Sequence, residues 1–205
     1  MMAIAWSGRT GADEDFVGID LAAAELRGCT FTRCSFVDAV LTEAVTDRCL
    51  FGDCDFSGAR LNASRHADSA FLNCRFRAAS LFGAEFAACK LTGSGFEAAD
   101  LTALRIDRGD WSLVNLRHQD LAGQDLRGLR LREADLYGAD LRRTDLRGAD
   151  LDHAVLDAAV LNGADLRGAD LTGVDLRALD PREANLDVAQ AVALAQALGA
   201  RVHWD

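Results

Sequence analysis

The chain has 205 residues, 22 of them basic and 32 acidic, for a formal net charge of -10, and half of its residues are hydrophobic. This length and apolar fraction predict one folded domain and exclude a disordered acidic tail. The excess of acid argues against direct binding to nucleic acid, because such binding depends on Lys and Arg that neutralise phosphates. A basic protein surface is the expected partner.

The N-terminal residues 1–13 form a short lead-in. Their apolar run, Met1–Trp6, stops at Ser7 and carries no basic cluster, so it is too short for a secretory signal or a membrane span. We therefore expect a cytoplasmic protein that makes no membrane contact.

A five-residue repeat dominates residues 14–179. Every fifth residue from Phe16 to Leu176 gives 33 positions, and 31 of them are Phe, Leu, Ile or Trp, the exceptions being Thr46 and His66. The residue two places before each of these central positions is usually small, and all six cysteines belong to this small series. A period of five fits neither a helix nor a flat strand, since it would scatter the apolar residues around a helix and alternate them across a strand. It predicts a solenoid in which the chain bends at each repeat and every fifth side chain points inward.

The repeat unit, as in Cys54-Asp-Phe-Ser-Gly, resembles the pentapeptide-repeat family. The stretches 64–76, 124–133 and 186–199 resemble more narrowly the fluoroquinolone-resistance, gyrase-binding members of the MfpA and Qnr types, and the MfpA type most. The unbroken register leaves no room for the projecting loops of Qnr-type members. The resemblance implies an all-β solenoid, a right-handed quadrilateral β-helix with four repeats per coil and about eight coils.

One segment departs from the pattern of the family. MfpA-like chains carry a proline near the middle, and Ala103 stands in the matching place. Leu104 and Gly109 occupy small-series positions nearby, and Ile106 and Trp111 occupy central ones. We therefore expect an irregular coil at 102–111.

A C-terminal helix and tail are expected over 180–205. Asp187, with Gln190 three residues later, forms a capping-box pattern, and Gly199 suits the position after the helix end. The segment is more apolar than the cover of one coil end requires. It is therefore either a simple cap or the interface of a two-fold homodimer, which the resemblance favours. The residues expected in that interface are Val188, Val192, Leu194, Leu198, Val202 and Trp204.

No residue pattern points to catalysis, to a cofactor or to a metal. The cysteines lack the C-x-x-C spacing of zinc sites, and we expect them to be reduced core residues. His66, in a core position one coil above Thr46, is expected to be a hydrogen-bonded irregularity of the core. Because a filled core leaves no substrate cavity, we expect no enzymatic activity.

The residue before each central position is often acidic, strongly so after residue 95. In a four-repeat coil, residues 20 apart stack into columns, so Asp100, Asp120 and Asp140 should form one column with few basic neighbours. Asp125, Asp145 and Asp165 run beside arginines and should form a neutralised ladder. Such aspartates either serve the turns by binding backbone amides or let the rod imitate duplex DNA. The expected partner-contact residues are Asp100, Asp120, Asp140, Asp135, Asp150, Asp170 and the solvent-facing Phe82.

The resemblance implies a function. A rod of this type would bind DNA gyrase, through one or both of the two kinds of subunit in that enzyme, compete with DNA, and protect the enzyme from fluoroquinolone-type inhibitors. The alternative is a pentapeptide-repeat scaffold with a different protein partner.

Overall fold

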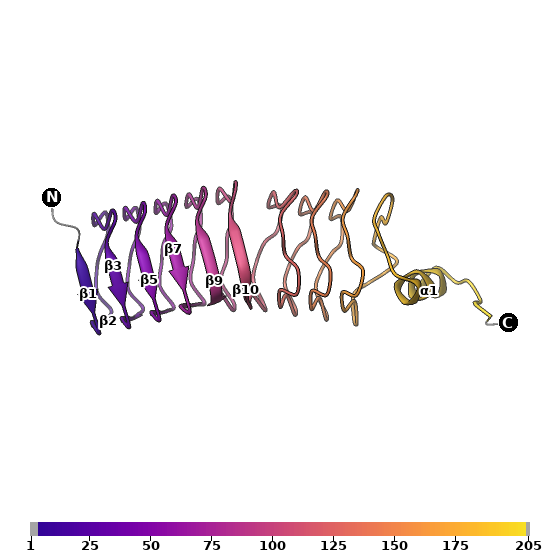
Figure 1. Ribbon diagram of the computed structural model, residues 1–205, viewed down its shortest axis with the longest axis horizontal. Coiled ribbons are helices and arrows are strands. Elements are labelled where there is room, and N and C mark those ends of the chain that lie inside the picture. Colours follow the sequence, from indigo (N-terminus) through magenta and orange to yellow (C-terminus); the bar gives the residue numbers. More distant parts are fainter. Residues whose placement is uncertain (1–3, 204–205) are drawn as a thin grey trace.

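The computed structural model describes residues 4–203, which form a rod (Figure 1). The chain winds around the long axis of the rod as a β-solenoid, and one helix, α1 (Val188–Ala197), lies at its C-terminal end. Within these residues, no helix has the length and apolar character needed to cross a membrane.

Each coil of the solenoid takes four repeats. Backbone partners lie 20 residues apart from the pair Ala5 and Glu25 to the pair Asp165 and Asn185, and the pairing is parallel. The fold class predicted from the sequence, a four-sided β-solenoid with a C-terminal helix, is therefore confirmed. We number the four faces by their central residues in the second coil: Leu26 on face 1, Phe31 on face 2, Phe36 on face 3 and Leu41 on face 4.

The strands lie on two neighbouring faces of the N-terminal half. On face 1 they are β1 (Ala5–Ser7), β3 (Glu25–Arg27), β5 (Val45–Asp47), β7 (Arg65–Ala67), β9 (Glu85–Lys90) and β10 (Arg105–Asp110). On face 2 they are β2 (Thr10–Ala12), β4 (Thr30–Thr32), β6 (Leu50–Gly52) and β8 (Ala70–Leu72). β9 and β10 continue around the corner into face 2. Elsewhere the coils are joined by single-residue bridges.

The corners explain the last position of the repeat unit. The residue two places after each central residue from Phe16 to Leu171 adopts a positive φ, for example 68° at Gly58 and 56° at Asp38. Glycine accepts this conformation without steric cost, and Asp and Asn tolerate it better than most other residues. At Gly58 a Cβ would also collide with the Asp38 carboxylate of the preceding coil. Glycine at position 58 therefore avoids both the backbone strain and this contact.

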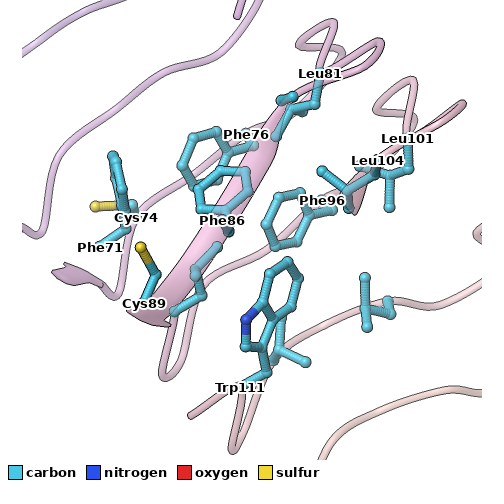
Figure 2. Close-up of a cluster of buried hydrophobic side chains, with 14 of the residues drawn as sticks. Phe71, Cys74, Phe76, Leu81, Phe86, Cys89, Phe96, Leu101, Leu104 and Trp111 are labelled. Carbon is cyan, nitrogen blue, oxygen red and sulfur yellow. The ribbon is translucent and has the colours of Figure 1, made fainter. Parts of the chain in front are cut away.

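Aromatic rings fill the N-terminal half of the core. On face 2 the ring centroids of Phe31 and Phe51 lie 5.5 Å apart, and those of Phe51 and Phe71 lie 4.8 Å apart. The aromatic packing extends to Phe96 and Trp111, whose ring centroids are 5.7 Å apart (Figure 2). After Trp111 every central residue of the register up to Leu176 is leucine.

All six cysteines are buried free thiols, as the sequence predicts. They occupy the inner corner positions, where several of their Sγ atoms hydrogen-bond carbonyl oxygens of the preceding coil. Cys74 donates to the Phe51 carbonyl at 3.4 Å, and Cys89 donates to the His66 carbonyl at 3.3 Å. Burial raises the pKa of Cys49 and of Cys89 to about 11, so these two side chains remain uncharged thiols at neutral pH.

The ladder of backbone bridges is interrupted on two faces. Among the described residues, no bridge joins Asp100 to Asp120 on face 4 or Arg105 to Asp125 on face 1, whereas Gly95 still pairs with Asn115 on face 3. We call this interruption the seam. Figure 1 shows it as a wider interval between β10 and the next coil.

Oversized inner residues account for the seam. Around it, small-series positions hold larger side chains, namely Leu104, Val114, Gln119, Gln124 and Leu129. Because the core is close-packed, extra volume at the corners pushes neighbouring coils apart. Trp111 lies in the coil next to the seam, and its indole N–H is buried without a hydrogen-bond partner among the described residues.

Candidate functional site

Asp100 and Asp120 on face 4 make no ion pair with a basic side chain among the described residues. Oδ1 of Asp100 accepts a 3.0 Å hydrogen bond from the Thr102 backbone N–H, and Oδ1 of Asp120 accepts one of 3.0 Å from Ala122. Both aspartates thus bind backbone amides of their turns, which is one of the two roles that the sequence left open. The turn bonds hold Oδ1 of each carboxylate, and both residues are exposed. Hydrogen bonds from Thr102 lower the pKa of Asp100, which keeps it charged at neutral pH.

Asp140 differs from Asp100 and Asp120 in having a basic partner. The Nε atom of Arg142 donates to it at 2.8 Å, and the two side chains form an ion pair that lowers the pKa of Asp140. Asp120 is bridged to Asp140, but Asp100 is bridged to Ser80 and lies across the seam from Asp120. The three aspartates lie on face 4 as the sequence predicts, but the ladder of bridges is interrupted between Asp100 and Asp120.

Phe82 also lies on face 4, one coil before Asp100. Its side chain is 50% exposed, as predicted from its place outside the core series. Its residue neighbour Gly83 donates a 3.0 Å hydrogen bond to the carbonyl of Thr102, in the coil of Asp100. Phe82, Asp100 and Asp120 are all exposed on face 4, and we call this set the face-4 patch.

The remaining predicted contact residues lie on other faces. Asp135, on face 3, is 2.9 Å from Arg117 in an ion pair. Asp150, on face 2, is 3.9 Å from Arg132. Asp170 follows Asp150 on face 2 and binds the Thr172 backbone N–H at 2.9 Å. The structure therefore distributes the predicted set over three faces and groups only the residues of face 4.

Face 1 of the C-terminal half carries the predicted neutralised ladder, and the ion pairs confirm it. Arg127 contacts Asp125 at 2.6 Å and Asp145 at 3.7 Å. The next coil repeats this arrangement, with Arg147 at 2.6 Å from Asp145 and 3.7 Å from Asp165. Arg167 completes the ladder and is the main cause that lowers the pKa of Asp165 to about 2. This face presents alternating charges and little net potential.

Helix α1 is fastened to the last coil by polar contacts. The side chain of Gln190 donates to the carbonyl oxygens of Leu166 at 2.6 Å and Ala169 at 2.9 Å. The predicted capping box between Asp187 and Gln190 is present, and the Asp187 carboxylate also accepts the backbone N–H of Gly168 at 2.9 Å. The sequence analysis assigned Gln190 only a capping role and missed its contact with the open coil edge.

The apolar residues predicted for the dimer interface differ in their solvent exposure. Val188 is 70% exposed and Leu198 is 67% exposed, whereas Val192, Leu194 and Val202 are half-buried. Trp204, also predicted for the interface, lies outside the described residues.

Over residues 4–203, no three His, Cys, Asp or Glu side chains gather in a group that could hold a metal ion.

Comparison with known proteins agrees with this architecture. Residues 15–45, 34–65, 112–148 and 140–177 match the family described as pentapeptide repeats. The chain is 45% identical over 95 residues to the pentapeptide repeat protein MfpA of Mycobacterium tuberculosis, a match that covers 46% of this chain and 52% of that protein. It is 38% identical over 71 residues to the MfpA protein of Mycolicibacterium smegmatis, covering 35% of this chain and 29% of the relative. The chain thus spans about half the length of one curated relative and under a third of the other.

Two solved structures share the fold. Trypsin-treated QnrB1, described as a plasmid-mediated fluoroquinolone resistance protein, superposes with a TM-score of 0.78 at 24% identity and covers 98% of this chain and 100% of its own. HetL from the cyanobacterium Nostoc, described as involved in the regulation of heterocyst differentiation, has a TM-score of 0.52 at 26% identity and covers 89% of this chain and 87% of its own.

Proposed function

The chain belongs to the pentapeptide-repeat family, and we propose that it is a non-enzymatic DNA mimic that binds DNA gyrase, competes with DNA, and protects the enzyme from fluoroquinolone-type inhibitors. The observation that carries this proposal is the 45% identity to MfpA over 95 residues. The likeness to QnrB1 agrees with it at the level of the fold. Such an activity takes place in the cytoplasm.

The face-4 patch supplies the contact surface in this proposal. Asp100 and Asp120 make no ion pair among the described residues, are ordered by their turn bonds, and share face 4 with the exposed Phe82. Pre-ordered carboxylates lose little freedom on binding, and an aromatic side chain provides an anchor that excludes water. The opposing surface of gyrase would be basic, since it must otherwise accept the phosphates of DNA.

The charge of the rod limits the mimicry to this local surface. Duplex DNA carries about one negative charge per 1.7 Å of its axis, so about 40 Å of duplex carries more than about twenty. This chain has a formal net charge of -10, and several of its aspartates are paired with arginine. The rod shape and the unpaired carboxylates, rather than total charge, therefore support the proposal.

The test is a titration of purified gyrase with this protein in supercoiling and DNA-cleavage assays, with and without ciprofloxacin. We expect supercoiling to fall as the protein is added, drug-induced cleavage to fall with it, and binding to weaken as salt rises. Gyrase that shows no salt-dependent binding and unchanged supercoiling and cleavage would refute the proposal.

The alternative is a scaffold for another protein partner. The observation that favours it is HetL, which has the same fold, covers 89% of this chain, and is described by a different role. In that case gyrase would not respond, whereas a partner from the native host would bind the same faces.

We also propose that the C-terminal end forms a two-fold homodimer. Val188 in α1 and Leu198 at its C-terminal end are exposed, while Gln190 fastens α1 to the last coil. A second copy of this chain would cover these apolar side chains and double the length of the rod.

A further inference from the structure

The first coil breaks the inner pattern that later coils follow. In the second coil the inward positions of faces 2 and 3 begin with Cys29, Phe31 and Cys34. The residues one coil earlier are Arg9, Gly11 and Glu14. Two long charged side chains thus replace small residues, and a glycine replaces an aromatic one. Charged residues at inward positions are unusual unless they are paired.

The two charged side chains are paired with each other. The Nη2 atom of Arg9 donates to Oε2 of Glu14 at 2.7 Å. The Arg9 guanidinium carbon lies 4.3 Å from the ring centroid of Trp6 and 5.1 Å from that of Phe16, within the range of cation–π contact. The ion pair therefore lies over the first aromatic rings of the core.

Gly11 makes room for this arrangement. A Cβ at this position would collide with the Glu14 carboxylate and come within 3.1 Å of the Phe31 ring. The carboxylate of Glu14 thus occupies the space that a phenylalanine side chain fills at this point of later coils. Arg9, Gly11 and Glu14 act as one unit, which we call the N-terminal lid.

The lid covers the place where the aromatic stack would otherwise meet water. The ring centroids of Trp6 and Phe31 lie 5.8 Å apart and those of Phe16 and Phe31 lie 5.6 Å apart. The Arg9 and Glu14 side chains are each 36% exposed, so they form the boundary between these rings and solvent. Without them, this end of the rod would expose an aromatic surface.

An end of this kind favours self-association. The coil edge with β1 and β2 has a neighbouring coil on one side only, and an open strand edge is a template for pairing with another chain. An apolar surface framed by such an edge would complement a second copy of itself. Burying the ion pair between two rods would instead require two charges to lose their contact with water.

We propose that the N-terminal lid keeps this end of the rod from pairing end to end with a second copy of the chain. This role of the N-terminal lid depends neither on gyrase binding nor on the C-terminal dimer. It leaves the rod with one closed end, so that self-association through the N-terminal coil does not hide the faces of the solenoid or extend it into a filament.

The test restores the regular inner pattern in the full-length protein with the substitutions Arg9→Ala, Gly11→Phe and Glu14→Ala. Sedimentation velocity should show a mass that rises with concentration above that of the wild type at the same concentration. A folded triple variant, shown by circular dichroism and a cooperative melt, that keeps the mass of the wild type at all concentrations would overturn the proposal.

A cysteine at Val17, which is exposed in the first coil, identifies the end that associates. The native cysteines are buried, so an oxidant should link chains through position 17 in the triple variant and not in Val17→Cys alone. A rise in mass without this cross-link would place the contact between chains elsewhere and would refute the proposed role of the N-terminal lid.

If the triple variant does not fold, Glu14→Ala alone uncovers Phe31 with less disturbance. The mass of Glu14→Ala must then rise at high concentration. The mass of Glu14→Gln, which keeps an oxygen acceptor for Arg9, must stay that of the wild type.

Discussion

His66 and Thr46 lie one coil apart in the core, and Nδ1 of His66 is 2.8 Å from Oγ1 of Thr46. The other ring nitrogen of His66 is 2.9 Å from Oγ of Ser64, and its ring is stacked 4.6 Å from that of Phe86. The predicted hydrogen-bonded irregularity is confirmed. The histidine is held as an aromatic ring with two hydroxyl partners, and burial lowers its pKa to about 3.

His66 should make the folded protein sensitive to mild acid. The unfolded chain binds a proton at this side chain below about 6.5, and the folded chain does not until about 3. The free energy of unfolding should therefore fall as pH falls between these values, by up to about 1.4 kcal/mol per pH unit. His66→Phe should flatten this dependence between pH 7 and pH 5 in urea unfolding experiments.

His66→Phe should leave the rest of the core satisfied, and an exposed histidine provides the control. Ser64 also donates to the Leu61 carbonyl at 2.7 Å, and Thr46 is 3.2 Å from Ser69, so both hydroxyls keep a partner in His66→Phe. Overpacking by the larger ring should cost no more than about 3 kcal/mol at neutral pH. His118→Gln, at an exposed site, should keep the pH slope of the wild type. An equal slope in His66→Phe and the wild type would contradict the assignment.

The face-4 patch should contribute more to gyrase binding than the neutralised ladder does. In Asp100→Asn with Asp120→Asn, the amide oxygens can still accept the turn bonds, so only the charges are lost. We expect the dissociation constant for gyrase to rise about tenfold or more and its salt dependence to weaken.

The ladder provides a control pair with the same change in net charge. Asp125→Asn with Asp145→Asn should alter gyrase affinity by no more than about threefold, because these carboxylates are already paired with arginine. Biolayer interferometry at two salt concentrations distinguishes the pairs. An equal loss of gyrase affinity in the two double variants would mean that total charge, not the face-4 patch, governs binding.

The seam should appear as a local loss of amide protection. One coil before it, the amides of Leu81 and Asp100 donate between coils at 2.8 and 2.9 Å. The equivalent amides of Leu101 and Asp120 have no backbone acceptor among the described residues. Hydrogen exchange followed by NMR should find Leu101 and Asp120 exchanging on the order of 100-fold faster than Leu81 and Asp100.

Reducing the oversized side chains at the seam tests its cause. Gln119→Ala with Gln124→Ala restores small inner residues, so it should let the coils close and slow the exchange of Leu101 and Asp120. Protection that is equal on both sides of the seam in the wild type would show that the ladder is continuous in solution.

Much of the fold is readable from the sequence because one side chain in five decides it. The register places Phe56 and Leu141 in the core, and both are buried. The neutralised ladder was also predictable, since Asp and Arg recur at one spacing. These features depend only on position within the repeat.

The features that sequence analysis missed depend on how whole coils meet. Gln119 is visible as an irregular residue, but its effect on the ladder depends on the packing of two coils. The buried position of Gln190 depends on how α1 is rotated against the last coil. The ion pair between Arg9 and Glu14 could be recognised only once the coil geometry was known. For the same reason the loss of the bridge between Asp100 and Asp120 was not predicted, although an irregular coil was expected at 102–111.

Self-association through α1 should respond to the exposed apolar residues and not to the buried glutamine contact. Val188→Asp with Leu198→Asp places charge on the side chains that face solvent while leaving the Gln190 contacts intact. If a second copy covers them, the variant should sediment as a monomer with a melting temperature close to that of the wild-type monomer, because charges buried in such an interface would lack partners. Leu113→Asp, at a residue 53% exposed in the middle of the rod, is the matched control and should leave the mass unchanged. A wild-type chain that is monomeric at all concentrations would mean that α1 is only a cap.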